Sequence, residues 1–131
     1  MTDRELLELA REARENSYSP YSHFAVGAAL LARSGKVYLG ANVENASFGA
    51  TNCAERTALF SAVAAGERDF VSIAICGGKV DEDTSECLPC GICRQALSEF
   101  CGADFRVIIE NKKDGTKALT LGELLPHVFD F

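Results

Sequence analysis

Three cysteines at the starts of two predicted helices constrain this chain more than any other feature of its sequence. Cys90 and Cys93 are three residues apart in the first turn of one predicted helix, so their side chains fall on one face. Cys53 opens a different predicted helix. The positive end of a helix dipole and its free amides favour the thiolate form of cysteine. A fold that brings these two helix starts together would therefore gather three thiolates at one centre.

The pattern of apolar residues predicts alternating helices and strands. Helical spacing predicts helices at about residues 3–16, 53–65, 90–101 and 121–125, and β-prone apolar runs predict strands at residues 24–32, 37–41, 71–76 and 105–109. Gly35 marks a hairpin turn between the first two strands, and the Asn- and Ser-rich residues 42–52 are expected to form a loop. This order indicates an α/β fold, a three-layer α-β-α sandwich with a mixed sheet and helices on both faces.

Length and charge narrow the class of protein. The 131 residues suffice for one compact core, so we expect a single domain over residues 1–131. The net charge is −6 and the 13 Lys and Arg residues are scattered, which argues against nucleic acid as a partner. The longest apolar runs are far too short to span a membrane, and the acidic first helix does not fit a signal peptide. We therefore expect a soluble, cytoplasmic protein.

In a reducing compartment, the six cysteines indicate metal binding or catalysis rather than disulfides. A catalytic zinc site uses three protein ligands and keeps one position for water, whereas a structural site is closed by four ligands. Cys53, Cys90 and Cys93 can supply the three ligands. Cys87 could close the site as a fourth, although Pro89 separates it from the helix start.

The other two cysteines, Cys76 and Cys101, lie in apolar periodic stretches and are expected in the core.

Two charged residues follow Cys53 in the same predicted first turn. The Glu55 carboxylate can reach beyond a metal without coordinating it, where a proton shuttle belongs, although an acidic residue there can also simply complement the helix dipole. Three thiolates around a dication leave a net negative charge, which makes a bound water less acidic. Arg56 could offset that charge by hydrogen-bonding the sulfurs, or it could be an exposed ion-pairing residue.

Residues 53–58 (Cys-Ala-Glu-Arg-Thr-Ala) and 89–95 (Pro-Cys-Gly-Ile-Cys-Arg-Gln) closely resemble the two zinc signatures of the cytidine deaminase family. The form that begins with cysteine resembles the small homotetrameric branch of the cytidine and deoxycytidylate deaminases. Similar blocks occur at residues 18–24 (Tyr-Ser-Pro-Tyr-Ser-His-Phe), 40–46 (Gly-Ala-Asn-Val-Glu-Asn-Ala) and 124–126 (Leu-Leu-Pro). The resemblance therefore covers nearly the whole chain.

The resemblance implies an enzyme with one Zn²⁺ per subunit that acts in pyrimidine salvage. It would convert free cytidine and 2′-deoxycytidine to uridine and 2′-deoxyuridine, with release of ammonia. A zinc-activated water would attack C4 of cytosine, and Glu55 would pass its proton to N3 and to the leaving amine.

The resemblance also implies a set of substrate-binding residues. Asn42 and Glu44 would bind the sugar hydroxyls, the Ala54 backbone would bind the base edge, and Phe24 would pack against the base. Phe129 would reach the site of a neighbouring subunit in a homotetramer. Taken without the resemblance, the first two are typical of turns and the two aromatic residues of core or tail packing.

Two other functions remain open. The chain could deaminate a related aminopyrimidine such as blasticidin S, because that branch resembles this one around the metal. It could also be a zinc-stabilised binding protein without turnover, although such a protein has no need of Glu55. The chain departs from the family pattern at Phe48, where the family usually carries Tyr, and in residues 79–88, which match nothing in the family.

Overall fold

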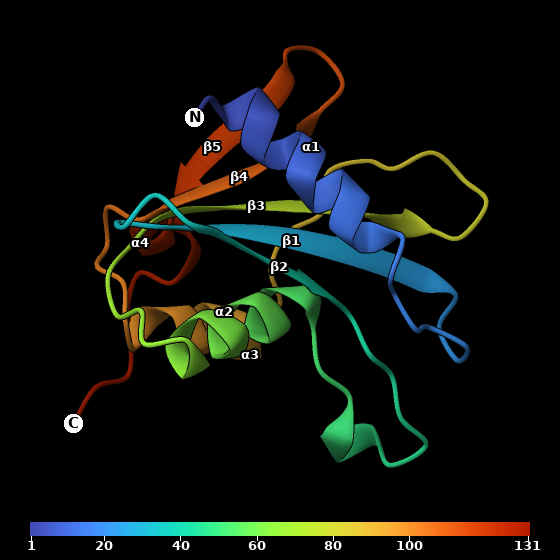
Figure 1. The fold of residues 1–131 in the computed structure, drawn as a ribbon, viewed down its shortest axis with the longest axis horizontal. Coiled ribbons are helices and arrows are strands. Elements are labelled where there is room, and N and C mark those ends of the chain that lie inside the picture. Colours follow the sequence, from blue (N-terminus) through green and yellow to red (C-terminus); the bar gives the residue numbers. More distant parts are fainter.

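The computed structural model describes residues 1–131, and Figure 1 shows a sheet held between helices on both of its faces. The strands are β1 (Phe24–Ala32), β2 (Val37–Ala41), β3 (Phe70–Lys79), β4 (Arg106–Asn111) and β5 (Gly115–Thr120), and they lie in the order β2-β1-β3-β4-β5. The helices are α1 (Asp3–Arg14), α2 (Ala54–Ala64), α3 (Gly91–Ser98) and α4 (Leu121–Leu124), with a short 3₁₀ turn, η1 (Phe48–Ala50). The predicted three-layer α-β-α sandwich is confirmed.

The sheet is mixed, as predicted. β3 and β4 run parallel, and the other neighbouring pairs are antiparallel. A parallel pair needs a long crossover connection, and here the segment between β3 and β4, which includes α3, provides it. β1 and β3 are apolar along almost their whole length because both faces of the sheet centre are covered.

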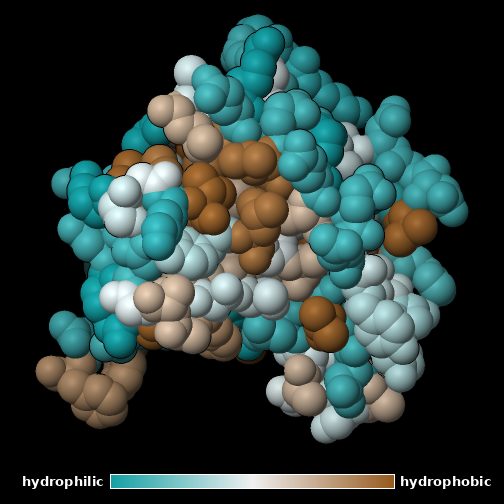
Figure 2. All heavy atoms as spheres, in the orientation of Figure 1, coloured by the Kyte–Doolittle hydropathy of each residue, from teal (hydrophilic) through white to brown (hydrophobic).

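Successive side chains of the central strands serve the two helix layers in turn. Ala29 of β1 faces α1, whereas Ala28 and Leu30 face the layer of α2 and α3. The α1 layer is built on one apolar stripe of the helix, and its outward face carries hydrophilic side chains (Figure 2). None of the helices combines the length and apolar character needed to cross a bilayer.

A glycine fixes the position of α2 against the sheet. A Cβ atom at Gly40 of β2 would lie 2.4 Å from the carbonyl oxygen of Ala54 and 2.4 Å from the backbone nitrogen of Ala58. Any side chain at this position would therefore push the first turn of α2 away from the sheet. This close packing determines where the N-terminus of α2, with Cys53 as its N-cap, meets the rest of the molecule.

The structure differs from the prediction at the ends of several elements and in one strand. β5 is absent from the prediction because it is an edge strand with mostly exposed residues and no continuous apolar run. β3 continues beyond residue 76 to Lys79, because Gly77 and Gly78 pair with β1. The predicted helix at residues 90–101 ends at Ser98. The two strand differences follow from tertiary pairing that local sequence patterns do not encode.

Candidate functional site

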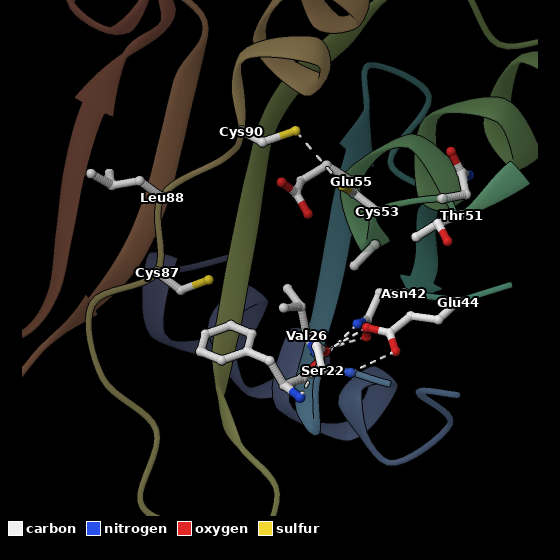
Figure 3. A pocket seen from close by; sticks show the side chains of 13 residues that line it. Ser22, Val26, Asn42, Glu44, Thr51, Cys53, Glu55, Cys87, Leu88 and Cys90 are labelled. Carbon is white, nitrogen blue, oxygen red and sulfur yellow. Dashed lines mark hydrogen bonds between the residues drawn. The ribbon is translucent and has the colours of Figure 1, made fainter. Parts of the chain in front are cut away.

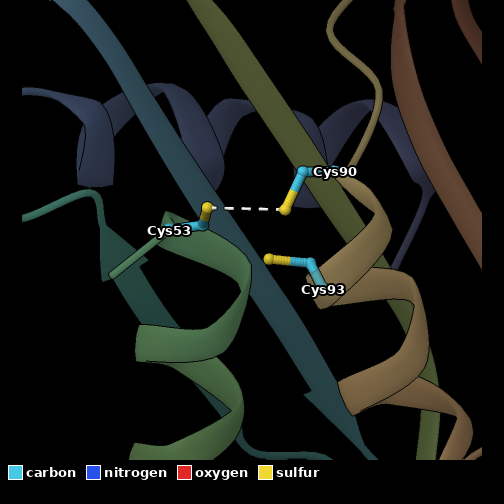
Figure 4. A group of neighbouring side chains, drawn as sticks. All are labelled: Cys53, Cys90 and Cys93. Carbon is cyan, nitrogen blue, oxygen red and sulfur yellow. Dashed lines mark hydrogen bonds between the residues drawn. The ribbon is translucent and has the colours of Figure 1, made fainter. Parts of the chain in front are cut away.

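The three predicted cysteine ligands meet at the N-termini of α2 and α3. Cys53 and Cys90 are the N-caps of these helices, Cys93 lies in the first turn of α3, and neither N-cap thiol makes a capping hydrogen bond to its helix. The three Sγ atoms lie within 4.8 Å of one another and point toward a common centre (Figure 4). The Cys53 and Cys90 sulfurs are 3.7 Å apart. Tetrahedral zinc with Zn–S bonds of about 2.3 Å places sulfurs about 3.8 Å apart, so this donor set fits zinc and keeps one ligand position free.

Cys87 does not belong to this group of thiols. Its side chain lines the neighbouring pocket instead, and burial raises its pKa to about 12, which keeps it a neutral thiol. The structure thus gives no support to a closed site of four cysteines. Cys76 is buried in the core on the α1 side of the sheet, as predicted. Cys101 is half-buried and packs against the core on the side of α2 and α3.

The charge of the thiol centre is tuned by its neighbours. Hydrogen bonds from Cys93 and Arg56 lower the pKa of Cys53 to about 5, against the opposing effect of burial. The hydrogen bond to Cys53, together with burial, raises the pKa of Cys93 above its usual range. A metal ion must displace the proton that Cys93 holds, so metal binding at this centre releases a proton.

The Arg56 side chain turns toward the sulfurs and not toward solvent. Its Nη2 atom donates to Cys53 Sγ at 3.4 Å. Although burial lowers the pKa of Arg56, its hydrogen bonds to Cys53 and Cys93 raise that pKa above its usual value. The guanidinium is therefore a fixed positive charge beside the thiols.

Glu55 brings an ionisable carboxyl to the edge of the thiol centre. It lies in the first turn of α2, is only 4% exposed, and burial raises its pKa to about 7. The negative charge of Cys53 acts in the same direction. In Figure 3 the carboxylate points into the pocket below Cys90. A carboxyl with this pKa can both accept and donate a proton near neutral pH.

A cavity of about 320 Å³ opens beside the thiols, within the size range of small-molecule sites (Figure 3). Its lining combines residues from the start of β1, the 42–52 loop, the first turn of α2 and the loop before α3: Ser22, Phe24, Val26, Asn42, Glu44, Thr51, Asn52, Cys53, Ala54, Glu55, Cys87, Leu88 and Cys90. The predicted residues Phe24, Asn42, Glu44 and Ala54 are thus brought together around Glu55.

Asn42 and Glu44 both have most of their hydrogen-bonding capacity engaged within the protein. Asn42 is 9% exposed, donates to the Phe24 carbonyl at 2.8 Å, and accepts from Ser17 and from the Val26 amide. One N–H of its amide remains free. Glu44 accepts from the backbone amides of Tyr21 and Ser22 and from the Ser22 hydroxyl.

These bonds lower the pKa of Glu44, the Ser22 hydroxyl having the largest effect, and one acceptor site of the carboxylate remains free. The rim of the pocket therefore offers one donor and one charged acceptor in fixed positions.

Sequence reasoning missed part of the lining: Ser22, Val26, Thr51, Asn52, Cys87 and Leu88. Ser22 stands in the block of residues 18–24, so that block was a usable signal. The residue after it, His23, has a φ of 57°, a left-handed conformation that redirects the backbone just before Phe24. Nothing in the sequence indicated that Cys87 and Leu88 would reach the pocket.

Phe129 does not line the pocket of its own chain. The residue is 65% exposed, and its ring makes an edge-to-face contact with Phe131, with the ring centroids 5.2 Å apart. Gln95 holds the segment by donating to the Phe129 carbonyl at 3.0 Å. The C-terminal tail thus presents aromatic rings to the outside, and it projects from the body of the molecule in Figure 2.

Known proteins are similar to this chain in both sequence and structure. A family model of the cytidine and deoxycytidylate deaminase zinc-binding region matches residues 1–109. Cytidine deaminase from Halalkalibacterium halodurans is 50% identical over 128 residues, which cover 97% of this chain and 94% of that protein. The crystal structure of cytidine deaminase from Burkholderia pseudomallei matches with a TM-score of 0.88 and 48% identity, covering 98% of this chain and 100% of that chain.

A more distant relative is blasticidin-S deaminase from Bacillus cereus, which is 34% identical over 128 residues, covering 95% of this chain and 89% of that protein. All of these matches extend over most of the chain, and the residues matched by the family model include the three thiols and Glu55. The chain therefore belongs to the cytidine and deoxycytidylate deaminase family of zinc-dependent hydrolases.

Proposed function

We propose that this chain, acting as one domain over residues 1–131, deaminates cytidine and 2′-deoxycytidine in pyrimidine salvage. Water and the nucleoside would give uridine or 2′-deoxyuridine plus ammonia. The observation that carries the proposal is the Glu55 carboxyl, buried inside a cavity beside three convergent thiols. The names of the relatives with 50% and 48% identity support the choice of substrate.

Glu55 is the proton carrier of this mechanism. When bound at the three thiols, zinc supplies the Lewis acidity that makes water acidic near neutral pH. The Glu55 carboxylate accepts the proton of the attacking water. It delivers this proton to N3 of cytosine, then takes up the second proton from the hydroxyl that is now on C4 and delivers it to the departing amine, so that its own charge is restored at the end of the cycle. Its pKa of about 7 suits both directions of transfer.

Arg56 and the two helix N-termini balance the charge of the thiolates. The Arg56 guanidinium lies 3.4 Å from Cys53 Sγ, and α2 and α3 both direct their positive ends at the sulfurs. By withdrawing charge from the sulfurs, these groups keep the metal acidic enough for its role.

The rim residues bind and orient the nucleoside. The free acceptor of Glu44 takes a hydrogen bond from a sugar hydroxyl, and the free N–H of Asn42 donates one. Phe24 packs against the base, and the Ala54 backbone, in the first turn of α2, meets the base edge. Because the protein already holds these groups in place, little ordering is needed when the substrate binds.

The same proposal includes a homotetramer in which the C-terminal tail of one subunit reaches the pocket of another. Phe129 and Phe131 are exposed, and so is Ile92 on α3. Figure 2 also shows apolar side chains gathered over the edge of the sheet between the helix layers. Clusters of exposed apolar residues are typical of surfaces that subunits cover.

The decisive experiment follows the loss of cytidine's ultraviolet absorbance on addition of purified protein, beside the Glu55→Gln variant. Zinc content is determined for both samples. We expect turnover by the wild type, a loss of about 10²–10⁴-fold in kcat in the variant, and equal zinc in both. Zinc-loaded wild type that leaves cytidine and 2′-deoxycytidine unchanged would contradict the proposal.

Because one relative is a blasticidin-S deaminase, blasticidin S is a second candidate substrate, and the same assay is run with it. Faster turnover of that compound than of cytidine would favour a deaminase for related aminopyrimidines. Zinc binding without turnover of any of them would indicate a binding protein. The raised pKa of Glu55 argues against this last outcome, because a structural zinc needs no proton carrier.

A further inference from the structure

The loop between β3 and α3, residues 80–90, passes from one face of the sheet to the other. Near its middle, Thr84 lies on the α1 side, where Arg11 Nη1 donates to its hydroxyl at 3.0 Å. Three residues later, Cys87 packs against the core on the side of α2 and α3, and with Leu88 it lines the nucleoside pocket. One short segment therefore connects a contact behind the sheet to a wall of the site.

Two glycines let this segment lie directly on the end of β3. Ser85 forms a bridge with Gly77 and donates its amide to the Gly77 carbonyl at 3.2 Å. A Cβ atom at Gly77 would lie 2.6 Å from Cys87 Sγ, and one at Gly78 would lie 3.0 Å from the Thr84 Cα. The loop thus continues the sheet beyond the end of β4, with Thr84 and Cys87 on its opposite sides.

Arg11 is itself held in place by β4. Its Nη2 donates to Glu110 Oε1 at 3.0 Å, while the buried Glu110 Oε2 accepts no hydrogen bond within the protein. Burial opposes the charge of this carboxylate, and the Thr84 hydroxyl and Arg11 together offset that effect, so that the pKa of Glu110 is lowered. We call Arg11, Thr84 and Glu110 the Arg11 clasp. Both bonds are partly shielded from water, where charge-assisted hydrogen bonds are stronger than at a fully exposed surface.

We propose that the Arg11 clasp positions the wall formed by Cys87 and Leu88 and thereby sets the affinity for the nucleoside. Thr84 is a positioning residue, because it acts through the loop and does not touch the pocket. The inference rests on the proposed function, since the occupant of the pocket is taken to be the nucleoside. Because the wall lines the pocket and transfers no proton itself, it supports binding in the ground state and the transition state alike.

The test removes the clasp's hydroxyl without changing side-chain shape. Thr84→Val is expected to raise KM for cytidine about three- to tenfold with kcat within about twofold, because the lost bonding weakens uniform binding. Thr84→Ser keeps the hydroxyl and should restore the wild-type KM. Thr120→Val, which removes the N-cap of α4 away from the clasp, is the matched control for general stability and should leave KM unchanged.

A second readout does not depend on turnover. In the zinc-loaded protein, alkylation of Cys87 is followed by mass spectrometry of the peptide that contains it. We expect faster alkylation in Thr84→Val than in the wild type and the control, because a released wall exposes the thiol. If Thr84→Val does not fold, Glu110→Gln loosens Arg11 while the sequence of the loop stays unchanged, and it should shift KM and alkylation in the same direction.

Unchanged KM and unchanged Cys87 alkylation in Thr84→Val would overturn the inference. An equal rise in KM in Thr120→Val would overturn it too, since the effect would then be one of general stability. A wild type that does not deaminate cytidine, combined with faster Cys87 alkylation in Thr84→Val, would contradict the proposed function and leave the clasp supported.

Discussion

The two ends of the pocket are built in different ways. At the inner end, Cys53, Cys90 and Glu55 stand on the first turns of two helices that pack against the sheet. At the outer end, Phe24 and Glu44 stand where a strand begins and a loop passes, and Phe24 is 38% exposed. The inner end takes its charge from helix dipoles and Arg56, whereas the outer end is held by hydrogen bonds among its own side chains. Chemistry is thus placed at the starts of two helices, and substrate recognition at a strand end and in a loop.

Removal of a thiol is the strongest way to break the inner end. Cys90→Ala leaves two ligands at the centre, so we expect loss of bound zinc and of all measurable turnover, together with a lower melting temperature. Cys101→Ala, away from the three convergent thiols, is the control and should retain zinc. Zinc content and cytidine turnover are measured on both variants. Full zinc in Cys90→Ala would mean that Cys87 can replace it.

The inner end should also depend on how closely α2 approaches the sheet. Gly40→Ala places a Cβ against backbone atoms of Ala54 and Ala58, which forces α2 outward. We expect a loss of about 3 kcal/mol in the free energy of unfolding and weaker zinc binding. Gly49→Ala, in the outer loop where a Cβ meets nothing, should change neither quantity. Denaturant unfolding and zinc titration are measured on both variants. Equal effects in the two would mean that the packing of α2 against the sheet does not control stability or zinc binding.

Arg56 tests whether the charge of the thiols limits activity. Arg56→Ala should retain zinc and lose about 10–100-fold in kcat, because the sulfurs then donate more charge to the metal. Arg56→Lys keeps a positive charge without the planar guanidinium, so its kcat should lie between those of the wild type and Arg56→Ala. Zinc content and pH–rate profiles are the measurements. Kinetics that match the wild type across the pH range would show that the guanidinium is only a structural partner of Cys53.

The inner end could be predicted from sequence because its residues are close together along the chain. Cys90 and Cys93 share one helix turn, and Glu55 follows Cys53 by two residues, so helix geometry alone gathers them into two groups. The α/β sandwich followed in the same way from local periodicity. These features depend on spacing within an element, which sequence patterns report well.

The outer end could be predicted only in part, because tertiary packing assembles it. Ser22 and Glu44 meet across a loop, and Cys87 reaches the pocket only because Gly77 allows the segment to lie on β3. No local pattern records such contacts. The strand β5 was not predicted for the same reason, because it is defined by its pairing with β4 and its residues are mostly exposed. Sequence patterns therefore predict the chemistry of this site better than the shape of its pocket.

Glu44 offers the smallest and most specific test of the outer end. Glu44→Gln removes the negative charge and replaces one acceptor oxygen by an NH₂ donor. That donor faces groups that now donate to the Glu44 carboxylate: the amides of Tyr21 and Ser22 and the Ser22 hydroxyl. We expect a fall of about tenfold in kcat/KM for cytidine, because a charged acceptor for a sugar hydroxyl is lost. Zinc content should be unchanged, since the centre lies at the other end. The free base cytosine has no sugar, so its turnover should be equally slow in both proteins. A loss of kcat/KM with cytosine as large as that with cytidine would instead mean that Glu44 maintains the whole pocket, and that its two ends are less independent than their construction indicates.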